Sequence, residues 1–185
     1  MEPIFYGPDG KIVTDIDLQN KRQWCADGVV LENEFVKKWG EKFGYGMNPA
    51  KGTDPFAPDL MSYTGILTDL KHQHSPFFKS REKFGIDPTY MVVFNVKDRI
   101  RYEEKYPDID IIYHVDWRKL TYVSYGREFR VNYLFGIYRT PFRKLLSLLD
   151  RSKVHTYLQR LNDENGNARD SYVFDIRNPI FQQLA

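Results

Sequence analysis

The stretch from residue 58 to residue 73, PDLMSYTGILTDLKHQ, constrains the fold most, because it carries charged residues on a predicted strand. Residues 65–71 are rich in β-forming side chains, which predicts a strand. Side chains alternate along a strand, so Asp69 and Lys71 project from one face while Leu70 points into the core. A second short strand over residues 59–63, joined through a hairpin, would bring Asp59 alongside Asp69. The pattern predicts two carboxylates and one amine at one edge of a sheet.

This combination of side chains suits the hydrolysis of a phosphodiester bond. Two carboxylates supply the hard oxygen ligands that Mg²⁺ prefers, and they leave coordination positions open for water and a phosphate oxygen. A bound ion lowers the pKa of its water and stabilises the charge that grows on phosphorus. A lysine beside the ion can position or deprotonate the attacking water, or neutralise the phosphate.

Pro58-Asp59 followed by Asp69-x-Lys71 resembles the motif of the PD-(D/E)XK nuclease superfamily, whose members cleave nucleic acid with a divalent metal. The resemblance implies Mg²⁺, replaceable by Mn²⁺, held by Asp59 and Asp69 with the Leu70 carbonyl as a further ligand. It also implies that Lys71 orients or activates water. The alternative for the same residues is a surface turn at Pro58-Asp59 and a solvated strand end.

Two further residues are matched to this family. A helix is predicted over residues 28–42, with a stop at Gly44, and its apolar face contains Leu31, Phe35, Val36, Trp39 and Phe43. Glu32 lies on that face, where an acid is costly unless it is paired or bound to metal, whereas Glu34 points away. The resemblance implies a glutamate from this helix in the active site, so Glu32 is matched to it and Glu34 is the fallback. Gln73 lies on the face of Asp69 and Lys71 and is expected to assist the phosphate or the water. The alternative for Glu32 is an acid near a helix start, favoured by the helix dipole.

The order of predicted elements agrees with the same resemblance, which covers residues 28–117. After the first helix and an irregular stretch come strands at 59–63 and 65–71, a helix at 76–84, a strand at 91–96, a helix at 98–105 and a strand at 109–115. We therefore expect an α/β fold with an αβββαβ restriction-endonuclease-like core, in which helices flank a mixed sheet. A chain of 185 residues suggests a single domain. It would have an N-terminal arm or hairpin (1–27) and a basic α+β extension (118–185) with a helix starting at Thr140-Pro141.

Charge is unevenly distributed along the chain. The segment between Trp117 and Arg160 contains ten basic and two acidic residues, a net charge of +8, so the remainder of this +2 chain carries −6. A basic region beside acidic metal ligands suits a polyanionic substrate. The residues expected to contact the DNA backbone, without reading its sequence, are Lys51, Arg118, Lys119, Arg127 and Arg130.

The sequence therefore predicts a Mg²⁺-dependent DNA endonuclease. The sequence does not decide whether the protein is a homodimer, although cutting both strands often requires two active sites. A single cysteine excludes an intrachain disulfide, and no segment suits a membrane or a targeting signal. We expect an intracellular location, in the cytoplasm or nucleoid, including that of a host cell if the gene is phage- or virus-encoded. His72 and His74 would need a third ligand to bind a metal. One rival is a catalytically inactive nucleic-acid-binding or assembly protein on the same fold, and another is an unrelated α/β interaction protein with Asp59 far from Asp69.

Overall fold

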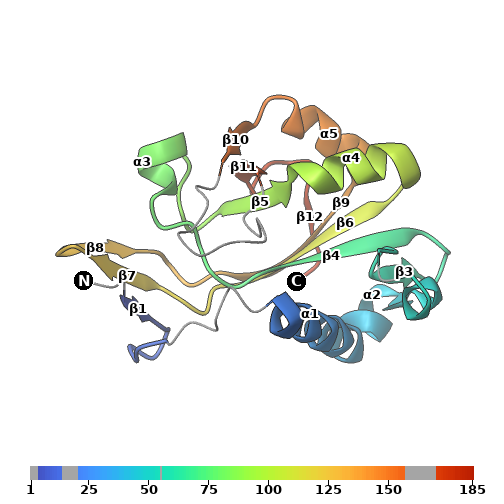
Figure 1. Cartoon of the computed structure of the whole chain (residues 1–185), viewed down its shortest axis with the longest axis horizontal. Coiled ribbons are helices and arrows are strands. Elements are labelled where there is room, and N and C mark those ends of the chain that lie inside the picture. The colour runs from blue at the N-terminus through green and yellow to red at the C-terminus, as the bar shows by residue number, and fades with distance from the viewer. Residues whose placement is uncertain (1–3, 14–20, 55, 157–169) are drawn as a thin grey trace.

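A six-stranded mixed sheet lies at the centre of the computed structural model, which describes residues 4–13, 21–54, 56–156 and 170–185 (Figure 1). β4 and β6 run parallel, and every other neighbouring pair in this sheet is antiparallel. The predicted α/β class with a mixed sheet is therefore confirmed. From one edge to the other the strands are β12 (Gln182–Gln183), β9 (Phe135–Pro141), β6 (Asp110–Asp116), β4 (Leu67–Gln73), β3 (Leu60–Ser62) and β2 (Tyr45–Met47).

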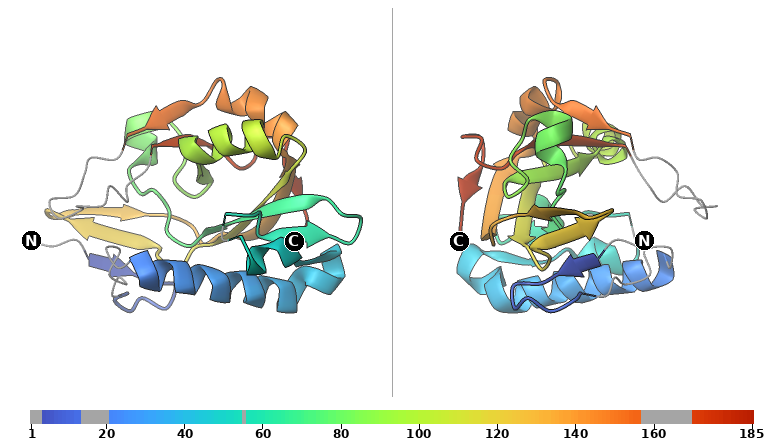
Figure 2. Two further views of the ribbon diagram at one scale, coloured as in Figure 1. Left: turned by 45° about the vertical axis from the view of Figure 1, so that its right-hand side comes forward. Right: turned by 90° about the vertical axis from the view of Figure 1, so that its left-hand side faces the viewer.

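Helices cover both faces of this sheet (Figure 2). α1 (Lys21–Phe35), a π-helical turn (Val36–Gly40) and α2 (Glu41–Phe43) lie along one face. α4 (Val96–Lys105) and α5 (Phe142–Leu149) lie over the other. Each face buries its own core, since side chains alternate across the strands. The α1 side contains Phe35, Tyr45, Leu60, Leu70, Ile112 and Ile137. The α4 and α5 side includes Phe94, Tyr102, Ile111, Tyr113, Val115, Trp117, Phe142 and Leu145.

Two smaller antiparallel sheets complete the fold. One joins β10 (Lys153–His155), β11 (Ser171–Asp175) and β5 (Met91–Asn95), so the strand predicted at 91–96 lies outside the central sheet. The other joins β1 (Ile4–Tyr6), β7 (Thr121–Ser124) and β8 (Arg127–Arg130). The arm predicted over residues 1–27 thus contributes a strand paired with β7, while its residues 1–3 and 14–20 lie outside the described ranges. β9 and β12, from the predicted extension, are strands of the central sheet.

The helices differ from their predicted bounds. The helix predicted from residue 28 begins at Lys21, and it does end before Gly44, whose φ of 74° suits glycine. The helix predicted over 76–84 forms only as α3 (Ser80–Phe84), because the Phe78 ring is buried and stacks on Tyr122 with centroids 5.5 Å apart. α5 begins at Phe142, since Thr140 and Pro141 still pair with β6 as the end of β9.

Within the described ranges, no helix combines the length and the apolar character that crossing a lipid bilayer requires.

We predict that Ile112→Ala lowers the free energy of unfolding by about 2–5 kcal/mol, because Ile112 is fully buried in β6. The same change at Ile100 on α4, where the side chain is 52% exposed, should alter it by less than about 0.5 kcal/mol. Urea unfolding measures both, and similar losses for the two variants would contradict this packing.

Candidate functional site

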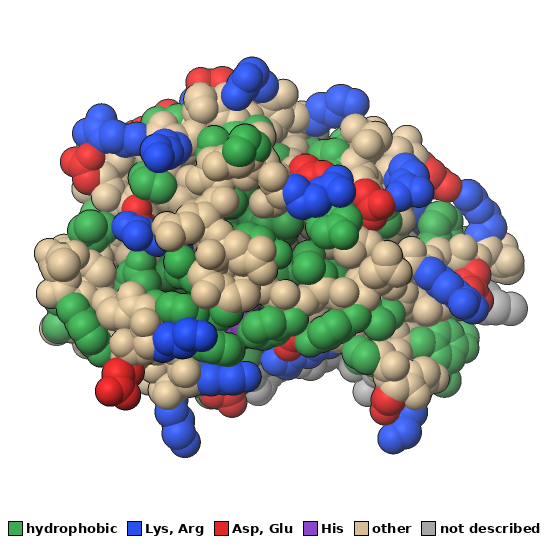
Figure 3. Space-filling model, turned by 180° about the vertical axis from the view of Figure 1, so that it is seen from behind, with side chains coloured by type: hydrophobic (Ala, Val, Ile, Leu, Met, Phe, Trp, Pro, Cys, Tyr) green, Lys and Arg blue, Asp and Glu red, His purple; other side chains and the backbone are tan. Residues whose placement is uncertain are grey.

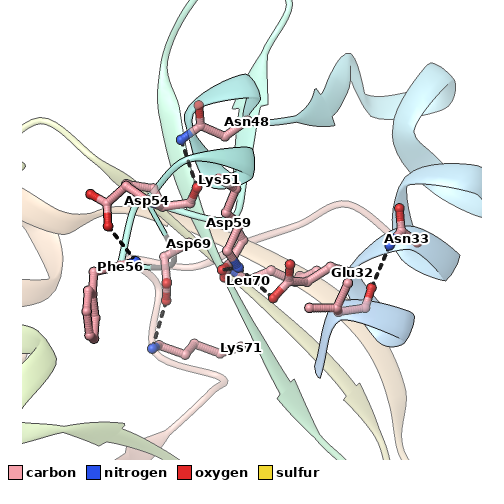
Figure 4. Close-up of polar contacts among 12 residues, drawn as sticks. Glu32, Asn33, Asn48, Lys51, Asp54, Phe56, Asp59, Asp69, Leu70 and Lys71 are labelled. Atoms are coloured by element: carbon pink, nitrogen blue, oxygen red, sulfur yellow. Dashed lines mark hydrogen bonds and ion pairs between the residues drawn. The ribbon is translucent and has the colours of Figure 1, made fainter. Parts of the chain in front are cut away.

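Asp59 and Asp69 meet where β3 enters the central sheet. β3 pairs with β4 through Leu60 and Thr68, and continuing this register by one residue places Asp59 opposite Asp69. The Leu70 backbone N–H donates a hydrogen bond of 2.9 Å to Asp59 Oδ2 (Figure 4). The two carboxylates lie close enough that the charge of Asp59 acts to raise the pKa of Asp69. The structure thus brings together the two acids that the sequence pattern paired.

Glu32 joins Asp59 from α1 through a shared lysine. Lys51 Nζ lies 2.7 Å from Glu32 Oε1 and also contacts Asp59 Oδ1 (Figure 4). Burial acts to lower the pKa of Lys51, but the attraction of Asp59 and Glu32 raises it above its ordinary value. The second carboxylate oxygen of Glu32 is buried without a hydrogen-bond partner. Glu34, the fallback residue, is exposed, so Glu32 is the α1 acid that faces the sheet.

Lys51 is held in place by the loop that leads into Asp59. It lies in a 3₁₀ turn (Pro49–Gly52) that Asn48 caps by accepting a 3.1 Å hydrogen bond from the Ala50 N–H. The Asn48 amide donates a second hydrogen bond, of 2.8 Å, to the Pro58 carbonyl. One buried asparagine therefore ties the lysine-bearing turn to the residue before Asp59. Lys51, expected to contact DNA phosphate, instead lies between two carboxylates.

Lys71 lies between two carboxylates on the other face of the sheet. Its Nζ is 2.8 Å from Asp69 Oδ2, without hydrogen-bond alignment, and it also contacts Asp98 Oδ2 at the start of α4. Asp98 Oδ1 lies 3.1 Å from Arg101, whose guanidinium donates to the Tyr102 hydroxyl at 2.6 Å. Asp98 was not predicted, because an acid in a first helical turn has an ordinary explanation in the helix dipole.

The two lysines are fully charged near neutral pH. Burial alone would lower the pKa of Lys71, but the neighbouring Asp69 and Asp98 carboxylates raise it well above its ordinary value. Burial raises the pKa of Asp69, and the Lys71 ammonium opposes that shift. A lysine in this state supplies positive charge and hydrogen-bond donors. Because it is already protonated, it cannot act as a base.

Lys51 therefore lies between Glu32 and Asp59, and Lys71 lies between Asp69 and Asp98. Leu70 separates Asp69 from Lys71 along β4. The side chains of all six residues are only 6–18% exposed. The six residues are Glu32, Lys51, Asp59, Asp69, Lys71 and Asp98. We call this set the charged cluster.

The charged cluster contains the type of oxygen donor that a divalent cation prefers. Glu32 Oε2 is a buried oxygen without a hydrogen bond, Asp69 Oδ2 is a buried oxygen 2.8 Å from the Lys71 ammonium, and carboxylate oxygens are hard ligands. Lys51 already places one positive charge between Glu32 and Asp59. Among the described residues, no three histidine, cysteine, aspartate or glutamate side chains are arranged to hold a metal in their present orientations. Ion binding would thus require the Lys51 ammonium to move aside. Gln73 lies half-buried on β4, two residues beyond Lys71.

The other residues predicted to bind DNA lie on and beside the hairpin of β7 and β8, at the opposite end of the long strands from β3 (Figure 1). Arg118 is 3.4 Å from Asp116 and Arg127 is 2.6 Å from Glu82, and Arg130 pairs with Glu128. Lys119 Nζ lies 4.4 Å from the centroid of the Phe5 ring. Seen from behind, lysine and arginine side chains are dispersed between hydrophobic and neutral ones (Figure 3).

A group of histidines lies on the face of the central sheet that α1 covers. His72 on β4 and His114 on β6 are register partners with Nδ1 atoms 3.1 Å apart, and the His74 ring centroid is 5.6 Å from that of His72. Burial lowers the pKa of His72 to about 3 and that of His74 to about 4, and neighbouring positive charge acts in the same direction. The sequence pattern indicated His72 and His74, but not His114, which is 42 residues from His72.

No known protein family, curated protein or solved structure matches this chain. The geometry and charge of the charged cluster and of the histidines are therefore the features that bear on function.

The low pKa values of these histidines predict how the stability of the folded protein depends on pH. Their folded-state pKa values lie below the ordinary 6.5, so the unfolded chain binds more protons at mildly acidic pH. Stability should be fully present above pH 6.5 and should fall as the pH is lowered toward 4, by up to about 1.4 kcal/mol per pH unit for each histidine. Urea unfolding from pH 7.5 to 4.5 should show a shallower slope for His72→Asn than for the unchanged protein. Equal slopes would contradict the assignment.

Proposed function

We propose that this protein is a divalent-metal-dependent deoxyribonuclease that hydrolyses phosphodiester bonds within DNA. The observation that carries the proposal is the charged cluster, in which four acids and two lysines gather around β3 and β4 of the central sheet. Functional sites typically contain buried charges at this density. In other parts of a protein, burying charges and placing like charges side by side costs folding free energy. The order of α1, β3, β4 and β6 is compatible with the restriction-endonuclease-like core that the motif implies.

Glu32, Asp59 and Asp69 would hold Mg²⁺ or Mn²⁺, with the Leu70 carbonyl as the further ligand that the motif implies. The Leu70 N–H fixes Asp59 through Oδ2, which orients the carboxylate with respect to Asp69. When bound, the metal would acidify a water molecule and stabilise negative charge on the phosphate.

Lys71 would stabilise the negative charge that develops on the phosphate. Its pKa, raised by Asp69 and Asp98, keeps it an ammonium group, so its part is electrostatic and it does not deprotonate the water. Asp98 would act as a positioning residue, since it contacts Lys71 from the first turn of α4. Gln73, on the same strand, would assist the phosphate or the water.

DNA would be held through its phosphates, without direct reading of bases. Arg118, Lys119, Arg127 and Arg130 place positive charge on one end of the molecule, within the segment of net charge +8. The exposed ion pairs of Arg118, Arg127 and Arg130 are weak in water, so phosphate groups can replace the acidic partners.

One observation favours a second function, that of a DNA-binding or assembly protein that does not cleave. Lys51 fills the position between Glu32 and Asp59, and an ammonium group there can neutralise the two acids permanently. Under this alternative the charged cluster is structural, and no divalent ion enters it.

We predict that purified protein cleaves at least one of linear duplex, nicked, branched or single-stranded DNA in a Mg²⁺ or Mn²⁺ series. Asp69→Asn and Lys71→Ala should each lower the cleavage rate by about 10²-fold or more, because each removes a charged group from the reacting centre. Glu32→Gln should also lower it, whereas Glu34→Gln, an exposed acid on the same helix, should leave it unchanged. Cleavage that survives both Asp69→Asn and Lys71→Ala would refute this site.

Lys51→Ala separates the two functions. If the ammonium occupies the position of the ion, its removal should tighten Mg²⁺ binding by at least roughly fivefold, the equivalent of an ion pair worth about 1 kcal/mol. Calorimetric titration measures this, with the exposed Lys37→Ala as the matched control. Absence of Mg²⁺ binding and cleavage in the unchanged protein, together with tight DNA binding, would favour the second function.

A further inference from the structure

Three of the four histidines in this chain gather on the face of the sheet that α1 covers. His72 and His114 are register partners on the parallel strands β4 and β6, and His74 follows His72 by two residues. Because side chains alternate, all three project from the face of Leu70 and Ile112, while Lys71 projects from the opposite face. The ring centroids are 5.0, 5.6 and 6.4 Å apart.

Two of the three rings each have one buried nitrogen without a partner. The Nε2 atoms of His72 and His74 are buried without a hydrogen bond, whereas the Nδ1 atoms of His72 and His114 share one hydrogen bond of 3.1 Å. Buried polar atoms in native proteins almost always have a partner, so exceptions require an explanation such as a water molecule or an ion. Two nitrogen ligands of one tetrahedral Zn²⁺ are about 3.3 Å apart, given metal–nitrogen bonds of about 2.0–2.1 Å. The separation of the His72 and His114 nitrogens is close to that value.

Asp116 supplies a carboxylate near His74 and His114. It ends β6 two residues after His114, and its charge acts on both His74 and His114. Its Oδ1 accepts a hydrogen bond of 3.1 Å from the Tyr133 hydroxyl, which fixes its orientation. The positive groups that face these rings are Arg118, 3.4 Å from Asp116, and Lys38, and both are exposed to solvent.

We propose that His72, His74 and His114, with Asp116 as the fourth ligand, bind a single late first-row transition-metal ion such as Zn²⁺, Ni²⁺ or Co²⁺. Imidazole nitrogens suit these ions, whereas the hard Mg²⁺ ion prefers oxygen ligands. The rings now pack at 55–84° to one another, and they do not direct three nitrogens at one point. Rotation of the His74 ring is therefore part of the binding. The ion would link β4 to β6 and stabilise the folded protein.

The test is a titration of the full chain, without added Mg²⁺, with Zn²⁺ and with Co²⁺. We expect one tightly bound equivalent of Zn²⁺, a raised melting temperature, and visible d–d absorption from bound Co²⁺ that excess Mg²⁺ does not remove. His74→Gln and His114→Asn should each lose this equivalent. His155→Ala, which changes the one histidine outside the group, should retain it.

Two further measurements distinguish Zn²⁺ binding at the histidines from binding at the charged cluster, and a lost site from an unfolded variant. The double variant Asp59→Asn, Asp69→Asn should still bind Zn²⁺, and a loss there would overturn the proposal by placing the ion among the carboxylates. In the unchanged protein, nuclear magnetic resonance should show Zn²⁺ shifting the ring signals of His72, His74 and His114 but not those of His155. Zn²⁺ that leaves those three rings unaffected, or binds equally well to His74→Gln and His114→Asn, would also overturn it. Either result would leave the proposed nuclease activity untouched.

Discussion

Charge buried on β4 has to be neutralised where it lies, and this requirement organises the centre of the molecule. Asp69 is 4% exposed and Lys71 lies beside it, so neither group is solvated by bulk water. Removing a charge from water costs several kcal/mol unless a partner of opposite sign is close. α4 supplies that partner as Asp98, while Asp59 at the start of β3 is satisfied by Lys51 and by the Leu70 N–H. The entry of β3, the middle of β4 and the start of α4 are thereby held in one arrangement.

Stability alone does not explain so many charges in one place. Replacing buried ion pairs by packed hydrophobic side chains is often neutral or stabilising, so a buried ion-pair network is weak evidence for a stabilising role. Functional sites, by contrast, regularly contain groups that the rest of the fold must accommodate. The two lysines differ in the part of the fold that carries them. Lys51 comes from a 3₁₀ turn, whereas Lys71 is part of the central sheet and lies between Asp69 and Asp98.

Alternation along β4 separates charged side chains from imidazole side chains. Asp69 and Lys71 project toward α4, and Leu70 and His72 project toward α1. A slip of one residue in the register of β4 would exchange these faces and bury the charges among Phe35 and Leu60. The parallel pairing with β6 prevents this slip, and the same pairing brings His114 beside His72.

The sequence alone determined the local elements that carry the candidate site. The spacing of residues 59, 69 and 71 predicted the short strand, the turn and the alternation of β4, and the apolar face of the first helix distinguished Glu32 from Glu34. These features depend on backbone periodicity over a few residues, which local pattern records. The tertiary structure decided the partners of those residues. Lys51, Asp98 and His114 belong to a surface turn, a helix start and a distant strand, and nothing in their own neighbourhoods distinguishes them from solvated or packing residues. The placement of β5 outside the central sheet and of β9 within it was decided in the same way, because strand pairing depends on contacts between segments far apart in the chain.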